Sequence, residues 1–268
     1  MPDDDASNQS VPASLAAEGV VYEAIRVDST GPVTTITLHR PQALNAITVT
    51  MLRELCSALE AIANDEAVSV VVITGEGRAF SAGVDLKALG RARPEEGTVG
   101  DGLNSAAREA IQRIGDLPAV VIAKINGHCF TGALELALAC DVIVTADEAS
   151  FGDTHAKWGL RPTWGMSQRL PTLVGIARAR ELSYTARVFK GTDAAAWGLA
   201  ATSCPLAELD GVVASMADAI AANSRGSLLA YKDLYRAAQR LPMPDGLAYE
   251  ASTEYLISDT GTRVGGFR

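Results

Sequence analysis

The chain has 268 residues, of which 48% are hydrophobic and 21% charged, and its formal net charge is −9. This composition is typical of a globular protein with a substantial core, and the acidic balance argues against a general nucleic-acid-binding surface. We therefore expect small molecules or further subunits as partners, and no nucleic acid.

Cysteine use, hydropathy and histidine spacing narrow the class further. The four cysteines form no C-x-x-C pair and no signal-peptide-like region opens the chain, so we expect reduced thiols in a cytoplasmic protein. No apolar run reaches the roughly 18 residues of a membrane span, so we expect no membrane association. His39, His128 and His155 show no metal-ligand spacing, and we predict no metal site.

The N-terminal part begins with a tail and continues with a predicted hairpin. Residues 1–19 are polar, acidic and rich in Pro and Ser, which predicts disorder. Two stretches with alternating β-branched residues, 20–27 and 33–38, flank turn residues and predict a β-hairpin. Apolar residues then recur at helical spacing over residues 48–63, which predicts an amphipathic helix.

The middle of the chain alternates buried strands with loops and helices. The run S-V-V-V-I-T at residues 69–74 is continuous and β-branched, so it predicts a strand buried on both faces. It leads into a glycine-rich loop, residues 75–87, which we expect to open a short helix. A helix over about residues 103–114 and a strand over residues 119–125 follow.

The stretch from Asn126 to Asp141 reads N-G-H-C-F-T-G-A-L-E-L-A-L-A-C-D and predicts a loop followed by a buried helix. Glu135 interrupts this apolar helix, and burying an unpaired carboxylate is costly. Near the start of the helix the macrodipole favours an anion, and the free N–H of Gly132 faces the same space. Glu135 is therefore either a base in a pocket or a core glutamate held by an arginine or a backbone cap.

The last third is predicted to be mainly helical. A strand over residues 142–145 precedes it, and helical patterns cover residues 208–222, 224–240 and 244–257. We predict a core of residues 20–205 and a C-terminal helical region of residues 206–268. Because these helices are amphipathic and rich in Ala and Leu, we expect them to pack on a neighbouring subunit.

Two well-known motifs are imitated in the glycine-rich loop. Gly75-x-Gly77 follows a strand, as in a dinucleotide-binding fingerprint, but the third glycine is missing and no ribose-binding acid follows cleanly. The run from Ala79 to Gly83 imitates a nucleophile elbow and raises a serine hydrolase with Ser81 and His155. A polar segment separates the strand from Ser81, and this histidine comes too early for the usual order of serine, acid and histidine. Both interpretations are therefore disfavoured.

A third interpretation of the loop concerns its backbone. Gly83 allows a tight turn that leaves the N–H of Val84 free at a helix start, where it can donate to an anion. Together with the N–H of Gly132, it would form an oxyanion hole for a thioester enolate. Removing one such donor costs about 3 to 4 kcal/mol in other acyl-transfer systems.

Four segments of the chain resemble the signature blocks of the crotonase family, the enoyl-CoA hydratase/isomerase superfamily. They are residues 39–46 (H-R-P-Q-A-L-N-A), 75–87, 125–141 and 151–170, in the order and spacing of the family. Residues 191–199 resemble the block that follows, and the similarity runs over about residues 20–258. Each block alone is moderately specific, whereas five in order are a strong signal.

The resemblance implies an α/β fold in which repeated ββα units form a spiral core, followed by C-terminal helices that trimerise, often into a dimer of trimers. It also implies an acyl-CoA substrate, with coenzyme A as part of the substrate and no separate cofactor. The thioester carbonyl would lie between the N–H groups of Val84 and Gly132. The coenzyme A path would be lined by Ala82, Val84, Asp85, Leu86 and Lys87. The Lys87 ammonium lies either beside a CoA phosphate or in solvent.

Two positions depart from the family pattern. In hydratases of the family two glutamates handle water and the α-proton; the first matches Glu135, but the second falls on His155. As an imidazolium with an ordinary pKa of about 6.5, His155 either protonates the α-carbon or fills a changed pocket as a polar residue. Asp153 either orients His155 or caps a turn. Trp164 stands where a small residue is common, which would reshape the acyl pocket.

We predict an enoyl-CoA hydratase-like lyase of fatty acid metabolism that adds water to a 2-enoyl-CoA, with Glu135 as general base and His155 as proton donor. Isomerisation or decarboxylation through the same enolate is the alternative within the family, because one of the two carboxylates is absent. A noncatalytic acyl-CoA-binding homologue is the alternative from another class.

Overall fold

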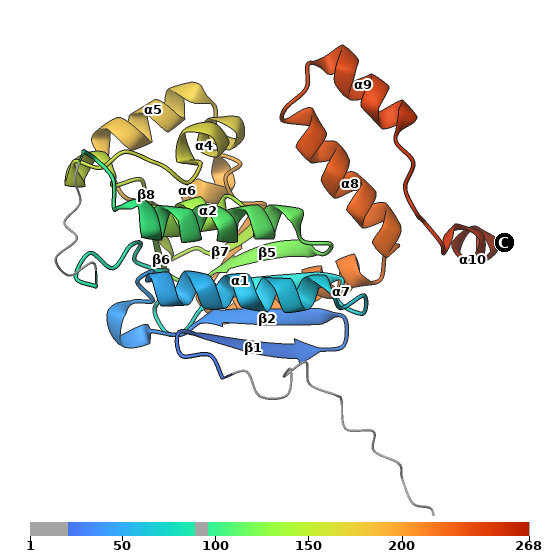
Figure 1. Cartoon of the computed structure of the whole chain (residues 1–268), viewed down its shortest axis with the longest axis horizontal. Helices are drawn as coiled ribbons and strands as arrows, with labels where there is room; N and C mark the ends of the chain where they lie inside the picture. The colour runs from blue at the N-terminus through green and yellow to red at the C-terminus, as the bar shows by residue number, and fades with distance from the viewer. Residues whose placement is uncertain (1–20, 89–95, 268) are drawn as a thin grey trace, which may run out of the picture.

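The computed structural model describes residues 21–88 and 96–267 (Figure 1). The predicted tail of residues 1–19 lies outside the described residues. Strands β1 (Ile25–Thr30) and β2 (Val33–Leu38) pair antiparallel around Gly31, which adopts a positive φ of 57°, and so confirm the predicted hairpin. No helix within the described ranges is long and apolar enough to cross a membrane.

The strands form two sheets, and the hairpin is part of the larger one. The larger sheet has the order β1-β2-β3-β5-β7-β10, and every pair after the hairpin is parallel. Its further strands are β3 (Val70–Gly75), β5 (Val120–Ile125), β7 (Val142–Ala146) and β10 (Thr202–Cys204). The smaller sheet has the order β4-β6-β8-β9. Its strands are β4 (Ala79–Ser81), β6 (His128–Phe130), β8 (Ser150–Gly152) and β9 (Phe189–Lys190).

The two sheets are connected by a repeated step of the chain. The paths β3 to β4, β5 to β6 and β7 to β8 each leave the larger sheet and enter the smaller one after a few residues. Gly127 makes one of these corners, because a Cβ there would lie 2.1 Å from the carbonyl oxygen of Arg78. The repetition of two strands and a following helix is the spiral of ββα units that the resemblance implies.

Helices cover the larger sheet. α1 (Val49–Ala63) and α2 (Asp101–Asp116) pack against each other, and Figure 1 shows them side by side in front of the strands. The side chain of Thr48 accepts a hydrogen bond from the N–H of Met51 at 3.2 Å and so caps α1 where the sequence predicts its start. Every residue of β3 is buried, as its uninterrupted apolar run predicts.

Several shorter helices and four C-terminal helices complete the described part of the chain. The shorter elements are η1 (Pro41–Ala43), α3 (Gly132–Ala137), η2 (Ala156–Trp158), α4 (Met166–Val174), α5 (Ile176–Thr185), α6 (Gly191–Ala196) and η3 (Leu206–Glu208). The C-terminal helices are α7 (Leu209–Ala221), α8 (Arg225–Ala238), α9 (Met243–Ser252) and α10 (Thr260–Gly265). α7 lies against the larger sheet, α8 contacts it at β5, and α9 and α10 extend away from it (Figure 1). The predicted helix of residues 244–257 ends early, at Ser252. The boundary between residues 205 and 206 stays a prediction.

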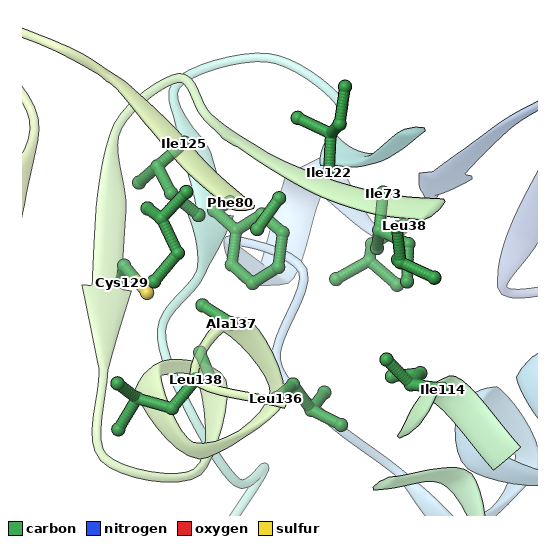
Figure 2. Packing of buried hydrophobic residues seen from close by; sticks show 14 of the residues in the cluster. Leu38, Ile73, Phe80, Ile114, Ile122, Ile125, Cys129, Leu136, Ala137 and Leu138 are labelled. Carbon is green, nitrogen blue, oxygen red and sulfur yellow. The ribbon is translucent and has the colours of Figure 1, made fainter. Parts of the chain in front are cut away.

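One hydrophobic core joins the two sheets and the helices. Figure 2 shows buried side chains from both sheets and from α3 in a single cluster, with Phe80 of β4 among them. Phe80, Leu38 and Ile122 are each fully buried. The core therefore holds β4, β6 and α3, the elements that lead into the site, in fixed positions.

Candidate active site

A cavity of about 710 Å³ opens beside the carboxyl ends of β4, β6 and β8, which are parallel neighbours in the smaller sheet. The loops that follow these three strands supply most of its wall. All eight residues predicted for the site line it: Ala82, Val84, Asp85, Leu86, Lys87, Gly132, Glu135 and His155. The structure therefore brings together residues that are up to 73 positions apart in the chain, from position 82 to position 155.

Two residues with free backbone N–H groups line this cavity. Gly83 has a φ of +91°, a conformation that favours glycine, and a Cβ there would lie 2.8 Å from the carbonyl oxygen of Phe130. The loop after β4 therefore packs directly against the end of β6. Among the described residues, the N–H groups of Val84 and Gly132 have no hydrogen-bond acceptor, so both are free for a ligand.

The prediction that Val84 begins a short helix is wrong. Val84 forms an isolated parallel bridge with Ile47. Ile47 donates to the carbonyl of Gly83 at 2.8 Å and accepts from the N–H of Asp85 at 2.9 Å. Because backbone groups alternate in direction along an extended segment, the N–H of Val84 points away from Ile47. A bridge of extended chain, and not a helix start, leaves this donor free.

Glu135 is 1% exposed, and its two carboxyl oxygens have different surroundings. Oε1 accepts hydrogen bonds from the backbone N–H groups of Trp164 at 2.9 Å and Met166 at 3.0 Å. Oε2 lies 3.5 Å from Nε2 of His155. Backbone donors therefore hold Oε1, as the interpretation of a capped core glutamate predicts, while Oε2 lies beside His155. The role of Glu135 as a base stays a prediction.

His155 is held between two carboxyl groups. Its Nδ1 lies 2.6 Å from Oδ1 of Asp153, whose Oδ2 accepts a hydrogen bond from the hydroxyl of Ser183 at 2.7 Å. Burial alone would lower the pKa of His155, but the contacts with Asp153 and Glu135 outweigh it and raise the pKa to about 9. Burial would raise the pKa of Asp153, but the bonds from His155 and Ser183 hold it below its usual value. The raised pKa favours the imidazolium form of His155 at neutral pH. Oδ1 of Asp153 also accepts a hydrogen bond from the backbone N–H of His155 at 3.3 Å, so Asp153 both orients the ring and caps the turn.

The loop after β4 is fixed by Arg40, which also lines the cavity. Arg40 donates to Oδ2 of Asp85 at 3.0 Å and to the carbonyl of Ala46 at 2.6 Å. Oδ1 of Asp85 accepts from the N–H groups of Lys87 and Ala88, at 3.1 and 3.0 Å. The carboxylate of Asp85 is thus used to hold the loop, whereas the exposed side chain of Lys87 remains at the cavity wall.

Comparison with known proteins identifies the group to which this site belongs. A family model for enoyl-CoA hydratase/isomerase matches residues 28–264. The chain belongs to the enoyl-CoA hydratase/isomerase family. Membership confirms the crotonase-like fold and makes the chain an enzyme of the hydratase kind.

Relatives in this family are similar over most of their length. Probable enoyl-CoA hydratase 1, peroxisomal, of Arabidopsis thaliana is 34% identical over 220 residues, which are 82% of this chain and 81% of the relative. The crystal structure of an enoyl-CoA hydratase from Bacillus anthracis has a TM-score of 0.80 and 35% identity, covering 85% of this chain and 88% of that chain. A putative enoyl-CoA hydratase from Thermobifida fusca, solved in complex with acetoacetyl-CoA, has a TM-score of 0.75 and 31% identity, covering 85% and 92%.

Membership in the enoyl-CoA hydratase/isomerase family agrees with the position of Ser81. This serine is fully buried and does not line the cavity, and its Oγ accepts a hydrogen bond from the N–H of Gly83 at 3.2 Å. The nitrogen atoms of His155 face Asp153 and Glu135 instead. The serine hydrolase interpretation is therefore wrong.

Two residues that hold cavity-lining or histidine-contacting side chains were missed by the sequence analysis. Ser183 lies on α5, 30 positions from the Asp153 that it contacts, so no local pattern indicates the pair. Asn104 is buried on α2, and its Oδ1 accepts a hydrogen bond from Nε1 of Trp164 at 2.8 Å. A polar residue on the apolar face of the predicted helix of residues 103–114 is the one signal that pointed to Asn104.

Proposed function

We propose that this protein adds water to the double bond of a 2-enoyl-CoA thioester. The supporting observation is the pair formed by Oε2 of Glu135 and Nε2 of His155, 3.5 Å apart in a cavity that two free backbone N–H groups also line. An oxygen atom can lie about 3 Å from both of these atoms at once, which is hydrogen-bond distance. One water molecule can therefore contact the base and the acid together.

In this proposal the thioester is held at its carbonyl. The carbonyl oxygen accepts hydrogen bonds from the N–H groups of Val84 and Gly132, which strengthen as negative charge develops on it. The related Thermobifida fusca protein has been solved with acetoacetyl-CoA, which supports a CoA thioester as the ligand class. The chain segment of Ala82, Val84, Leu86 and Lys87 would carry the coenzyme A portion toward the surface.

The chemistry then needs one base and one acid. The carboxylate of Glu135 takes a proton from water while the water oxygen bonds to the β-carbon, and the electron pair of the double bond moves to the thioester as an enolate. The imidazolium of His155 donates its Nε2 proton to the α-carbon, and the thioester carbonyl re-forms. The pKa of about 9 keeps His155 charged and ready for this step at neutral pH.

The separation of the two groups also explains how the site is restored. After one turnover Glu135 carries a proton and His155 is neutral. Across the 3.5 Å between Oε2 and Nε2 the proton can return from the carboxylic acid to the imidazole once the product leaves. The pair thus regains its starting charges without a third group.

Loss of enoyl-thioester ultraviolet absorbance with crotonyl-CoA tests the proposal. We expect Glu135→Gln and His155→Gln each to lower kcat by about 10²- to 10⁴-fold, the usual contribution of a general acid or base. His39→Gln is the matched control, because His39 contacts Glu76 and does not line the cavity. It should keep full activity.

The other outcomes separate the remaining family reactions. Wild-type protein that binds crotonyl-CoA without hydrating it contradicts the proposal and favours a binding role. Movement of the double bond in a 3-enoyl-CoA, with Glu135 needed and His155 dispensable, indicates an isomerase. Release of carbon dioxide from a malonyl-type thioester indicates a decarboxylase. We further propose assembly of the chain as a homotrimer or a dimer of trimers through α8 to α10.

A further inference from the structure

Trp164 is fixed more firmly than a side chain that only fills space. Its N–H donates to Oε1 of Glu135 at 2.9 Å, its carbonyl accepts from Arg169 at 3.1 Å, and its indole N–H donates to Oδ1 of Asn104 at 2.8 Å. The residue is 4% exposed and lines the cavity. Its ring cannot turn without breaking a buried hydrogen bond.

The partner of the indole is itself held. Asn104 is 3% exposed, and its Oδ1 also accepts a hydrogen bond from the hydroxyl of Thr163 at 3.0 Å. Its side-chain amide donates to the hydroxyl of Thr98 at 2.5 Å. Asn104 of α2, together with Thr98 before this helix and Thr163 beside the tryptophan, therefore holds the indole in one position.

The ring lies against the start of α3. A Cβ added to Gly132 would be 2.4 Å from Cζ3 of Trp164 and 3.1 Å from Cε3 and Cη2. No group fits between the ring and this residue. A carbonyl oxygen bonded to the N–H of Gly132 lies about 3 Å from that nitrogen, and the β-carbon of an enoyl thioester is only three bonds from this oxygen. With the thioester carbonyl bonded to Gly132, as the proposed function has it, the indole would face the first carbons of the acyl chain.

We propose that Trp164 closes the acyl pocket just beyond the β-carbon, so that the protein selects short-chain 2-enoyl-CoA thioesters such as the crotonyl ester over medium-chain and long-chain ones. The inference rests on the proposed acyl-CoA ligand. A longer chain has to displace an indole held by Asn104, or to leave apolar carbons in contact with water and the polar wall at Thr163 and Arg161.

Binding of saturated esters, which cannot be hydrated, tests the inference. The dissociation constants of butyryl-CoA and decanoyl-CoA are measured by calorimetry. We expect wild-type protein to bind butyryl-CoA at least tenfold more tightly, although the longer chain is the more hydrophobic. Trp164→Leu, which removes the ring, should shift the ratio of the two constants at least tenfold toward decanoyl-CoA. Trp164→Phe should shift it in the same direction by less.

Trp197→Leu is the matched control, because the ring of Trp197 packs at a tilt against Phe189, contacts two arginines and does not line the cavity. It should leave the ratio unchanged. Equal or tighter binding of decanoyl-CoA to the wild type overturns the inference. The inference is also overturned if Trp164→Leu is folded, as shown by cooperative melting, and its ratio of dissociation constants equals that of the wild type. If Trp164→Leu does not fold, the ratios of dissociation constants measured for the wild type and for Trp164→Phe test the inference.

The outcomes for the two proposals are distinguishable. Suppose that the protein prefers butyryl-CoA, that Trp164→Leu weakens this preference, and that crotonyl-CoA is not hydrated. This result supports the role of Trp164 in closing the acyl pocket and contradicts the proposed hydratase activity. Hydration of crotonyl-CoA and decenoyl-CoA with equal kcat/KM supports the proposed hydratase activity and overturns the proposal that Trp164 closes the acyl pocket. No binding of either ester overturns both.

Discussion

His155 is charged because its two acidic neighbours outweigh its burial. Asp153 at 2.6 Å and Glu135 at 3.5 Å together raise the pKa of the imidazole to about 9, against the lowering effect of desolvation. In the proposed reaction the protonated form is the active one. On the alkaline side the rate should therefore fall as the pH rises through this value.

Asp153→Asn tests this pH dependence. The substitution keeps the size of the side chain but removes the charge, so the pKa of His155 should fall and the alkaline limit of kcat/KM should move down by at least one pH unit. A pH profile and an NMR titration of the imidazole measure the two effects. Ser183→Ala removes only one hydrogen bond to Asp153 and should cause a smaller shift. An unchanged alkaline limit in Asp153→Asn would show that His155 is not the acid.

Individual site residues could be predicted from the sequence where they fall in a segment that resembles a signature block of the family. Glu135 and His155 could be paired because both fall in blocks that resemble one family. The raised pKa of His155 could not be predicted, since it depends on distances to two carboxylates. Ser183 and Asn104 escaped for the same reason: hydrogen bonds between distant segments leave no mark on local sequence.

At the scale of elements, the loop after β4 is the part that positions the donors. Gly83 combines a positive φ with close packing against Phe130, whereas Gly77 has a φ of +74° with only Pro41 nearby at 3.6 Å. The two glycines share the backbone conformation and differ in the space around them. Substituting each glycine therefore distinguishes the stability lost through backbone strain from the effect of moving the N–H group of Val84.

We expect Gly83→Ala to displace the loop, because its new Cβ would lie 2.8 Å from a backbone carbonyl. Stability should fall by roughly 1 to 3 kcal/mol, and kcat/KM at least tenfold as Val84 moves away from Gly132. Gly77→Ala should lose about 1 kcal/mol of stability and keep its activity. Urea unfolding and the crotonyl-CoA assay give both numbers. Equal loss of activity in the two variants would contradict this role of Gly83.

The elements themselves were predictable in proportion to their length. Helices α1 and α2 and strands β3, β5 and β7 show clear hydrophobic patterns over five or more residues, and their existence was predicted correctly. Strands β4, β6 and β8 have three residues each, too few to show a period. Their pairing is imposed by the sheet around them, so they were predicted as loops or left unassigned.

At the scale of the whole molecule, α8 presents two different faces. Arg225, Lys232 and Arg236 donate to backbone carbonyls near the end of α2 and the start of β5, which fastens one face to the core. Tyr231 and Tyr235 stack on each other at 5.7 Å and are exposed. Met243 and Leu247 of α9 are exposed as well. This arrangement supports the proposed contact with further copies of the chain.

Met243→Asp combined with Leu247→Asp tests the assembly. These side chains are 76% and 58% exposed and add little to their own core, so each subunit should stay folded. We expect light scattering to give a trimeric or hexameric mass for the wild type and a monomeric mass for the double variant. Leu206→Asp, on η3 and 48% exposed, is the control and should keep the wild-type mass. A monomeric wild type at micromolar concentration would contradict the proposal.

The geometry of Glu135 also has a stereochemical consequence. Because Oε1 is held by two backbone N–H groups, the carboxyl group cannot rotate, and Oε2 alone stays beside Nε2 of His155. In the proposed reaction, two groups only 3.5 Å apart would act on the same side of the planar double bond. If water and proton come from this pair, both enter from one face. In deuterium oxide the product should then be a single diastereomer with deuterium and hydroxyl added syn, which proton NMR coupling constants would reveal.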